Sequence, residues 1–123
     1  MMQGKKVLIL EDAIFVREME KKFLRGLGLS VFVETNSETD ALELLTHGGF
    51  GLAIVDLNIA EGSGESAIGK IRGQYPTLPI AVVTSFPDRL KKNEPYHAQY
   101  DIVLPKPFSE AEFRNRIGAL VHG

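Results

Sequence analysis

The sequence contains no cysteine and no tryptophan among its 123 residues. The lack of cysteine excludes a thiol nucleophile, a disulfide scaffold and any cysteine-based zinc or iron–sulfur site. Neither sign of charge dominates, since 14 Lys and Arg residues stand against 16 Asp and Glu residues, a formal net charge of −2. Because a grip on the phosphate backbone of a nucleic acid needs a basic face, we expect no direct nucleic-acid binding.

Long apolar runs are also missing. The N-terminal run behind Lys5 and Lys6 covers only residues 7–10 and stops at Glu11. A signal peptide needs about 7–15 apolar residues and a membrane span about 20. We therefore expect a cytoplasmic protein that does not enter a membrane. The chain length suits one domain, predicted to cover residues 1–123.

Short apolar segments typical of buried strands recur along the chain. They alternate with segments in which apolar residues have helical spacing, as between Ile14 and Leu27. In that first helix the predicted apolar positions are Phe15, Met19, Phe23, Leu24 and Leu27. The predicted strands lie near residues 7–10, 31–33, 52–55, 80–83 and 102–104.

Helix starts are marked by capping boxes, in which a hydroxyl residue is followed three positions later by an acid. Ser37 with Asp40 and Ser109 with Glu112 predict the starts of the second and last helices. A helix carrying Ala67, Ile68 and Ile71 follows the loop at Gly62 and Gly64. Between residues 86 and 100 the pattern is weak, and Pro87 and Pro95 predict an irregular fourth helix.

Five strands alternating with five helices predict a doubly wound, flavodoxin-like α/β domain with a parallel sheet. The common strand order for this fold is 2-1-3-4-5. Ligands bind beyond the carboxyl ends of the strands, where the strand order reverses between the first and third strands. The functional site is therefore expected at this edge.

Polar residues stand at the carboxyl ends of the predicted strands: Glu11, Asp12, Asp56, Thr84 and Lys106. Carboxylates about 4 Å apart repel by about 4 kcal/mol per pair at an effective dielectric near 20, so a cation must offset them. Lys106 supplies one charge, and Mg²⁺, which takes oxygen ligands, would supply two. A carboxylate, a cation, a hydroxyl and a lysine suit phosphoryl transfer, with aspartate as a possible acceptor.

Taken singly, each of these residues also has an ordinary structural role open to it. Asp12 could cap the helix that follows it, Thr84 could simply close its strand, and Lys106 could be a solvated surface residue. Their order and their common position at strand ends favour the functional interpretation.

The sequence resembles the receiver domain of response regulators, the CheY-like family of two-component signalling. The resemblance covers nearly the whole chain and rests on an ordered set of short motifs. These are Val7-Leu8-Ile9-Leu10-Glu11-Asp12, Leu52-Ala53-Ile54-Val55-Asp56-Leu57-Asn58, Gly64, Ala81-Val82-Val83-Thr84-Ser85 and Leu104-Pro105-Lys106-Pro107-Phe108.

By this resemblance Asp56 is the phosphoacceptor, and Thr84 and Lys106 bind the phosphoryl group. The resemblance also implies that Mg²⁺ is held by Glu11, Asp12, Asp56 and the backbone carbonyl of Asn58, and that the Lys106–Pro107 bond is cis. The chain would then be no enzyme beyond phosphotransfer to itself and loss of that phosphoryl group.

The implied phosphodonor is a sensor histidine kinase or a phosphotransfer protein. Output in the family runs through the face made by the fourth helix, fifth strand and fifth helix, toward a downstream protein, a missing effector domain or a second copy in a homodimer. Val103 stands where the family usually has an aromatic, and Ala60 where it usually has proline. Phe86, two residues after Thr84, predicts a long-lived phosphoryl state because its bulk hinders water.

Two other interpretations remain open. One is a receiver-like interaction module that signals without phosphorylation. The other is a small flavodoxin-like enzyme, but Ala13-Ile14-Phe15 offers no phosphate-cradling loop, and Asn58 stands where an Asp-dependent phosphatase generally uses a second Asp. His47, His97 and His122 lack metal-ligand spacing and are interpreted as surface residues.

Overall fold

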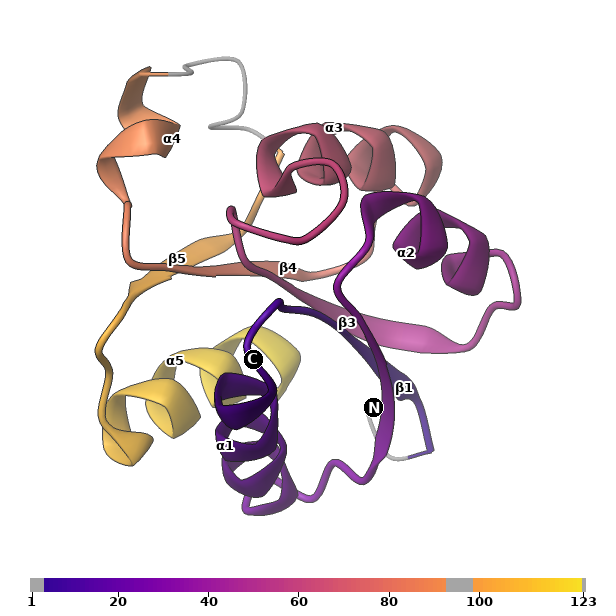
Figure 1. Ribbon diagram of the computed structural model, residues 1–123. Coiled ribbons are helices and arrows are strands. Elements are labelled where there is room, and N and C mark those ends of the chain that lie inside the picture. Colours follow the sequence, from indigo (N-terminus) through magenta and orange to yellow (C-terminus); the bar gives the residue numbers. More distant parts are fainter. Residues whose placement is uncertain (1–3, 93–98, 123) are drawn as a thin grey trace.

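The computed structural model describes residues 4–92 and 99–122 (Figure 1), in which strands and helices alternate. The strands are β1 (Lys6–Leu10), β2 (Val31–Thr35), β3 (Phe50–Val55), β4 (Ile80–Thr84) and β5 (Ile102–Pro105). The helices are α1 (Ile14–Arg25), α2 (Glu38–Leu45), α3 (Gly64–Gln74), α4 (Asp88–Lys92) and α5 (Glu110–His122).

The strands form one parallel sheet in the order β2-β1-β3-β4-β5, which confirms the predicted topology. Residues at the carboxyl ends pair in register, with Leu10 opposite Thr35 on β2 and opposite Val55 on β3. The order reverses at β1, so the ends of β1 and β3 lie beside each other at the switch point.

The sheet carries helices on both faces, with α2 and α3 on one side and α1 and α5 on the other (Figure 1). Even-numbered residues of β1, such as Leu8, pack in the core cluster of α2 and α3. Odd-numbered residues, such as Val7 and Ile9, pack in the cluster of α1 and α5 with Phe23 and Phe113. This alternation follows from the two-residue period of a strand.

The apolar pattern predicted the strands because the central three are covered on both faces. β4 is buried along its whole length, and β1 is buried from Val7 to Leu10. The edge strands β2 and β5 are only partly buried, which explains the weaker pattern of β2 in the sequence.

The start of α5 matches its predicted capping box in full. The backbone N–H of Glu112 donates to Oγ of Ser109 over 3.0 Å, and the N–H of Ser109 donates to Oε1 of Glu112 over 3.2 Å. At α2 only half of the predicted box forms: Oγ of Ser37 accepts from the N–H of Asp40, while the N–H of Ser37 donates to Oγ1 of Thr35.

The first helix differs from its prediction at both ends. Phe15, counted with the apolar face, is 78% exposed, and its neighbour Ile14 is 69% exposed, so the first turn of α1 contributes neither side chain to the core. The helix ends at Arg25 rather than Leu27, with Gly26 as its C-cap and Gly28 in the left-handed region that glycine tolerates.

The fourth helix, for which the sequence predicts an irregular form, is described over Asp88–Lys92. It has five residues and starts directly after Pro87, whose carbonyl accepts a hydrogen bond from the N–H of Leu90. Leu90 is 1% exposed and joins the core cluster of α2 and α3. The predictions for Pro95 and His97 concern positions outside the described residues.

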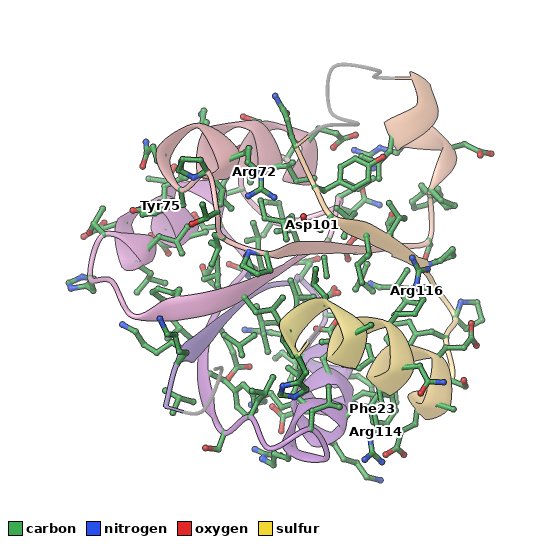
Figure 2. All side chains as sticks on the ribbon, turned by 180° about the vertical axis from the view of Figure 1, so that it is seen from behind. Phe23, Arg72, Tyr75, Asp101, Arg114 and Arg116 are labelled. Carbon is green, nitrogen blue, oxygen red and sulfur yellow. The ribbon has the colours of Figure 1, made fainter. Side chains whose placement is uncertain are left out.

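Far from the carboxyl edge, Arg72 of α3 ties together two loops (Figure 2). Its guanidinium donates to the carbonyls of Leu78 and Gln99 and to Oδ2 of Asp101 at 2.8 Å. Asp101 in turn accepts from the N–H of Ile80, the first residue of β4. This network fixes the start of β4 relative to β5.

Within the described ranges, no helix combines the length and apolar content that crossing a membrane requires.

Candidate functional site

Three backbone hydrogen bonds extend the sheet one residue beyond its strands and fix the site residues. The N–H of Glu11 donates to the carbonyl of Thr35, that of Asp56 to Leu10, and that of Lys106 to Thr84, over 3.0, 2.9 and 2.8 Å. Glu11, Asp56 and Lys106 therefore leave the sheet from defined positions at one edge.

The ammonium of Lys106 lies between two carboxylates. Its Nζ atom is 2.9 Å from Oε1 of Glu11 and 2.9 Å from Oδ2 of Asp56. Lys106 follows β5, and its side chain crosses the end of β4 to reach residues that follow β1 and β3. The peptide bond between Lys106 and Pro107 is cis, as the resemblance implied.

Burial strengthens the electrostatic coupling in this cluster. Glu11 is 2% exposed and Asp56 is 7% exposed. Burial raises the pKa of Glu11 above its usual value, and the hydrogen bond from Lys106 offsets this only in part. Burial acts to lower the pKa of Lys106, but its hydrogen bonds to Asp56 and Glu11 outweigh burial, so its pKa is raised and the ammonium stays charged.

Thr84 ends β4 and is fully buried. Its Oγ1 atom accepts a hydrogen bond from the N–H of Phe86 over 2.9 Å, which shapes the loop between β4 and α4. The Phe86 side chain is 52% exposed beside this loop. This hydrogen bond links the hydroxyl of Thr84 to the loop backbone that leads to α4. A movement of Thr84 would therefore be passed to α4 through this backbone.

The other predicted residues lie around this cluster in more open positions. Asp12 is exposed and is not the N-cap of α1, which is Ala13. The N–H of Ala13 donates to Oε2 of Glu11 over 3.1 Å. Asn58 is exposed, and its N–H donates to Oδ1 of Asp56 over 3.2 Å. Both oxygens of Asp56 therefore accept a hydrogen bond.

Gly64 is placed where no other residue fits without movement. A Cβ atom there would lie 2.2 Å from the carbonyl oxygen of Asp56 and 2.5 Å from Cα of Leu57. The first turn of α3 thus packs directly against the backbone of the site, which explains a glycine at this position.

Sequence reasoning missed an ion pair above the site. The guanidinium of Arg89 in α4 donates to both carboxylate oxygens of Glu65 in α3 and also to Oδ1 of Asn58. No local pattern marks this pair, because 24 positions separate Arg89 from Glu65.

Sequence reasoning also missed Glu20. This α1 residue is fully buried, and neither of its carboxylate oxygens has a hydrogen-bond partner. The available signal was spacing, since Glu20 lies three and four positions before Phe23 and Leu24 on the same helical face.

The donor chemistry at this edge fits Mg²⁺, which prefers carboxylate and carbonyl oxygens. Glu11, Asp12 and Asp56 offer carboxylates, and two of these are buried against a single ammonium. Across residues 4–92 and 99–122, no three His, Cys, Asp or Glu side chains are already grouped as metal ligands.

The fold and the acidic carboxyl edge place the protein in the class of flavodoxin-like α/β domains, with the candidate site at the switch point of a parallel sheet. The statistical model of the response regulator receiver domain family matches residues 7–118. The chain belongs to this family. It is a receiver domain of two-component signalling and not an enzyme in the ordinary sense.

Curated relatives agree with this assignment. The chain is 28% identical over 114 residues to the transcriptional regulatory protein CrdR of Helicobacter pylori, covering 92% of this chain and 53% of CrdR. It is 27% identical to the chemotaxis protein CheY-3 of Vibrio cholerae, covering 91% of this chain and 88% of CheY-3. The chain therefore spans about half the length of CrdR but most of CheY-3.

Solved structures share the fold. A CheY-like receiver domain from Methylobacillus flagellatus has a TM-score of 0.81 at 26% identity, covering 94% of this chain and 98% of that one. The receiver domain of a sensor histidine kinase from Pseudomonas aeruginosa has a TM-score of 0.84 at 22% identity, covering 98% of this chain and 99% of that one. That structure has a magnesium ion coordinated in its active-site cleft.

Proposed function

We propose that the chain is a phosphoacceptor whose Asp56 takes a phosphoryl group from a histidine of a sensor kinase or phosphotransfer protein. One observation carries this proposal: the Asp56 carboxylate is buried at the switch point and its Oδ2 is 2.9 Å from the Lys106 ammonium. A lysine in this position offsets the negative charge that a phosphoryl group brings.

A carboxylate oxygen of Asp56 attacks the phosphorus of phosphohistidine, forming an aspartyl phosphate as the phosphorus–nitrogen bond breaks. The imidazole nitrogen of the donor leaves with the electron pair of that bond and takes a proton from solvent. Lys106 stays charged because its pKa is raised, so it is able to pair with a phosphoryl oxygen. Thr84 would donate a hydrogen bond from its hydroxyl to another phosphoryl oxygen while its Oγ1 atom still accepts from the N–H of Phe86.

Mg²⁺ is the proposed cofactor, held by Glu11, Asp12, Asp56 and the backbone carbonyl of Asn58. When bound, it would neutralise negative charge shared between Asp56 and the phosphoryl oxygens. The buried carboxylates of this chain and the magnesium ion coordinated in the Pseudomonas aeruginosa receiver structure support this assignment.

The phosphodonor protein is expected to approach beside α1. Ile14 and Phe15, two and three positions after Asp12, are 69% and 78% exposed, which gives the site an apolar rim. A partner that brings a phosphohistidine to Asp56 must cover this rim, and apolar contact there would hold the two proteins together. Phe15→Ala is expected to slow transfer from the partner protein without changing labelling by a small phosphodonor.

We further propose that residues 1–123 form one receiver domain whose output is contact with another protein or effector domain. Phosphorylation would draw Thr84 toward Asp56, and the N–H of Phe86 transmits that movement to the start of α4. Val103, half-buried on β5, offers no aromatic rotamer to follow Thr84. The loop between β4 and α4 therefore carries the switch in this proposal.

The test is labelling by acetyl phosphate or phosphoramidate in the presence of Mg²⁺, followed by mass spectrometry. Wild type should gain one phosphoryl group, and Asp56→Asn should not. Asp40→Asn, an exposed substitution on α2, serves as the control and should label like wild type. Absence of label on wild type, or equal label on Asp56→Asn, would reject the proposal.

The second candidate function is a receiver-like module that signals by binding alone, favoured by Val103 on β5, where the family usually has an aromatic residue. It predicts that a downstream partner binds Asp56→Asn as tightly as the labelled wild type. A partner that binds only the labelled wild type would exclude it.

A further inference from the structure

Glu20 is a buried carboxyl group without a partner, next to the proposed acceptor site. It is fully buried, and both of its carboxylate oxygens lack hydrogen bonds. An unpaired polar group in such a position costs several kcal/mol unless it becomes neutral or serves a function. Among the described side chains, it is the one buried carboxylate with neither oxygen satisfied.

The topology places Glu20 under the site. The odd residues of β1 and the even residues of β3 pack against α1 and α5, and Glu11 and Asp56 continue these two rows at the carboxyl edge. Leu104 packs in the same layer, and Lys106 continues its row. Since α1 starts at this edge, Glu20 lies one turn closer to the site than Phe23 and Leu24.

The charged groups around Glu20 are those of the site. The charges of Glu11, Lys106 and Asp56 all act on its carboxyl group, and burial raises its pKa well above the usual value. From α5 the packed residues in this layer are the apolar Phe113 and Ile117. On its own helix Arg17 lies one turn earlier, with a buried Nε atom that has no partner.

The ammonium of Lys106 needs acceptors in every state of the site. It carries three N–H donors, of which two bond to Glu11 and Asp56. If a cation draws the carboxylates of Glu11 and Asp56 toward itself, Lys106 loses the two acceptors that it has in the resting state, and one phosphoryl oxygen would replace only one of them. The carboxyl oxygens of Glu20 can accept a hydrogen bond whether that group is neutral or ionised.

We propose that Glu20 is a positioning residue that provides a reserve acceptor for the Lys106 ammonium when a cation or phosphoryl group occupies the acceptor edge. This inference rests on the proposed function for the identity of the occupants. It explains why α1 keeps an acid at a buried position on its apolar face. A carboxyl group with only a packing role would be replaced there by an apolar residue with a gain in stability.

The test compares Glu20→Met with Glu20→Gln. Methionine fills the space but has no oxygen, whereas glutamine keeps one acceptor oxygen. Mg²⁺ binding is measured by calorimetry, and binding of beryllofluoride as a phosphoryl mimic is followed through the ¹⁵Nζ resonance of Lys106. Leu24→Met is the control, because it changes packing on the same buried face without removing an oxygen.

Glu20→Met should unfold at a higher temperature than wild type, yet bind Mg²⁺ and beryllofluoride about tenfold more weakly. Glu20→Gln and Leu24→Met should retain affinities near those of wild type. On beryllofluoride binding, the Lys106 ¹⁵Nζ resonance should move differently in Glu20→Met than in the other three proteins.

Equal Mg²⁺ and beryllofluoride affinities in Glu20→Met and wild type would overturn the inference. So would a loss in Glu20→Gln as large as that in Glu20→Met, because an acceptor oxygen would then be insufficient. Failure of the proposed function gives a different result, since wild type itself would then take no phosphoryl label at Asp56.

Discussion

The guanidinium of Arg89 meets the carboxylate of Glu65 through two parallel bonds, with Nε 2.9 Å from Oε2 and Nη2 2.8 Å from Oε1. Arg89 also donates to the side chain of Asn58, whose backbone N–H donates to Asp56. A two-bonded pair of this kind has a defined orientation. It ties the short α4 to α3 and to the loop that carries the acceptor.

The first prediction concerns this tie. Glu65→Gln should destabilise the fold by about 1 kcal/mol or less, because the Arg89 side chain is 35% exposed and solvent screens the pair. Amide exchange in α4, at Leu90 for example, should accelerate more than exchange in the central strands. Urea unfolding and hydrogen exchange measure the two effects. In the control Glu110→Gln, which breaks the more exposed pair with Arg114, α4 exchange should stay as in wild type; an equal change in both variants would contradict the prediction.

A second prediction contrasts two glycines of α3. Gly64→Ala should destabilise the fold by about 2 kcal/mol or more, since the new methyl group would overlap the backbone of Asp56 and Leu57. Gly73→Ala should stabilise it by about 0.5–1 kcal/mol, because no atom lies within 4 Å of the new methyl and alanine favours a helix. Denaturant unfolding of both variants decides the matter. Similar effects at the two positions would show that the close approach at Gly64 carries no cost.

Phe86 gives a third prediction, on the lifetime of the phosphoryl group. The backbone N–H of Phe86 donates to Oγ1 of Thr84, which holds this residue beside the end of β4. We expect the Phe86 ring to hinder the approach of water to the phosphoryl group on Asp56. Phe86→Ala should lose label roughly threefold to tenfold faster than wild type, as measured by mass spectrometry after the donor is removed. Val31→Ala, which removes an exposed apolar side chain on β2, provides the comparison. Unaltered decay in Phe86→Ala would refute this role.

A fourth prediction follows from the raised pKa of Glu20, which burial causes. The unfolded chain ionises this group near pH 4.3, whereas the folded chain ionises it only at higher pH. The stability that the neutral group contributes is therefore fully present below the unfolded pKa. It is lost as the pH rises from the unfolded pKa toward the folded pKa. Between the two pKa values, the free energy of unfolding of Glu20→Gln, measured with urea, should rise relative to that of wild type by about 1.4 kcal/mol per pH unit.

Glu38 supplies the control of opposite sign for that experiment. Burial acts to raise its pKa, but hydrogen bonds from Ser66 and Ser63 and the nearby Lys70 outweigh burial, so the pKa is lowered. Its contribution is present above the unfolded pKa and is lost as the pH falls. The free energy of unfolding of Glu38→Gln should therefore fall relative to that of wild type as the pH rises. Parallel pH profiles for wild type and Glu20→Gln would mean that Glu20 does not titrate abnormally.

Much of the fold follows from the sequence, because its signals are local. The fully buried central strands appear as continuous apolar runs, and the hydroxyl–acid pair of Ser109 and Glu112 marks the start of α5. The exposed Phe15 is the exception. Helical spacing places it on the apolar face of α1, but spacing does not show that the side chains of the first turn, Ile14 and Phe15, are exposed.

The residues at the acceptor edge could also be predicted, since a parallel sheet brings the carboxyl ends of its strands together. Their exact partners could not. The sequence by itself determined the alternation of strands and helices and, with the strand order common to this fold class, placed Glu11, Asp56 and Lys106 at one edge. Only the tertiary structure decided that Lys106 bridges both carboxylates, that Arg89 pairs with Glu65, and that Glu20 is buried with neither carboxylate oxygen hydrogen-bonded. The two pairings join residues far apart in the chain, and only strand pairing within the sheet, for Lys106, and helix packing, for Arg89, bring them within bonding distance.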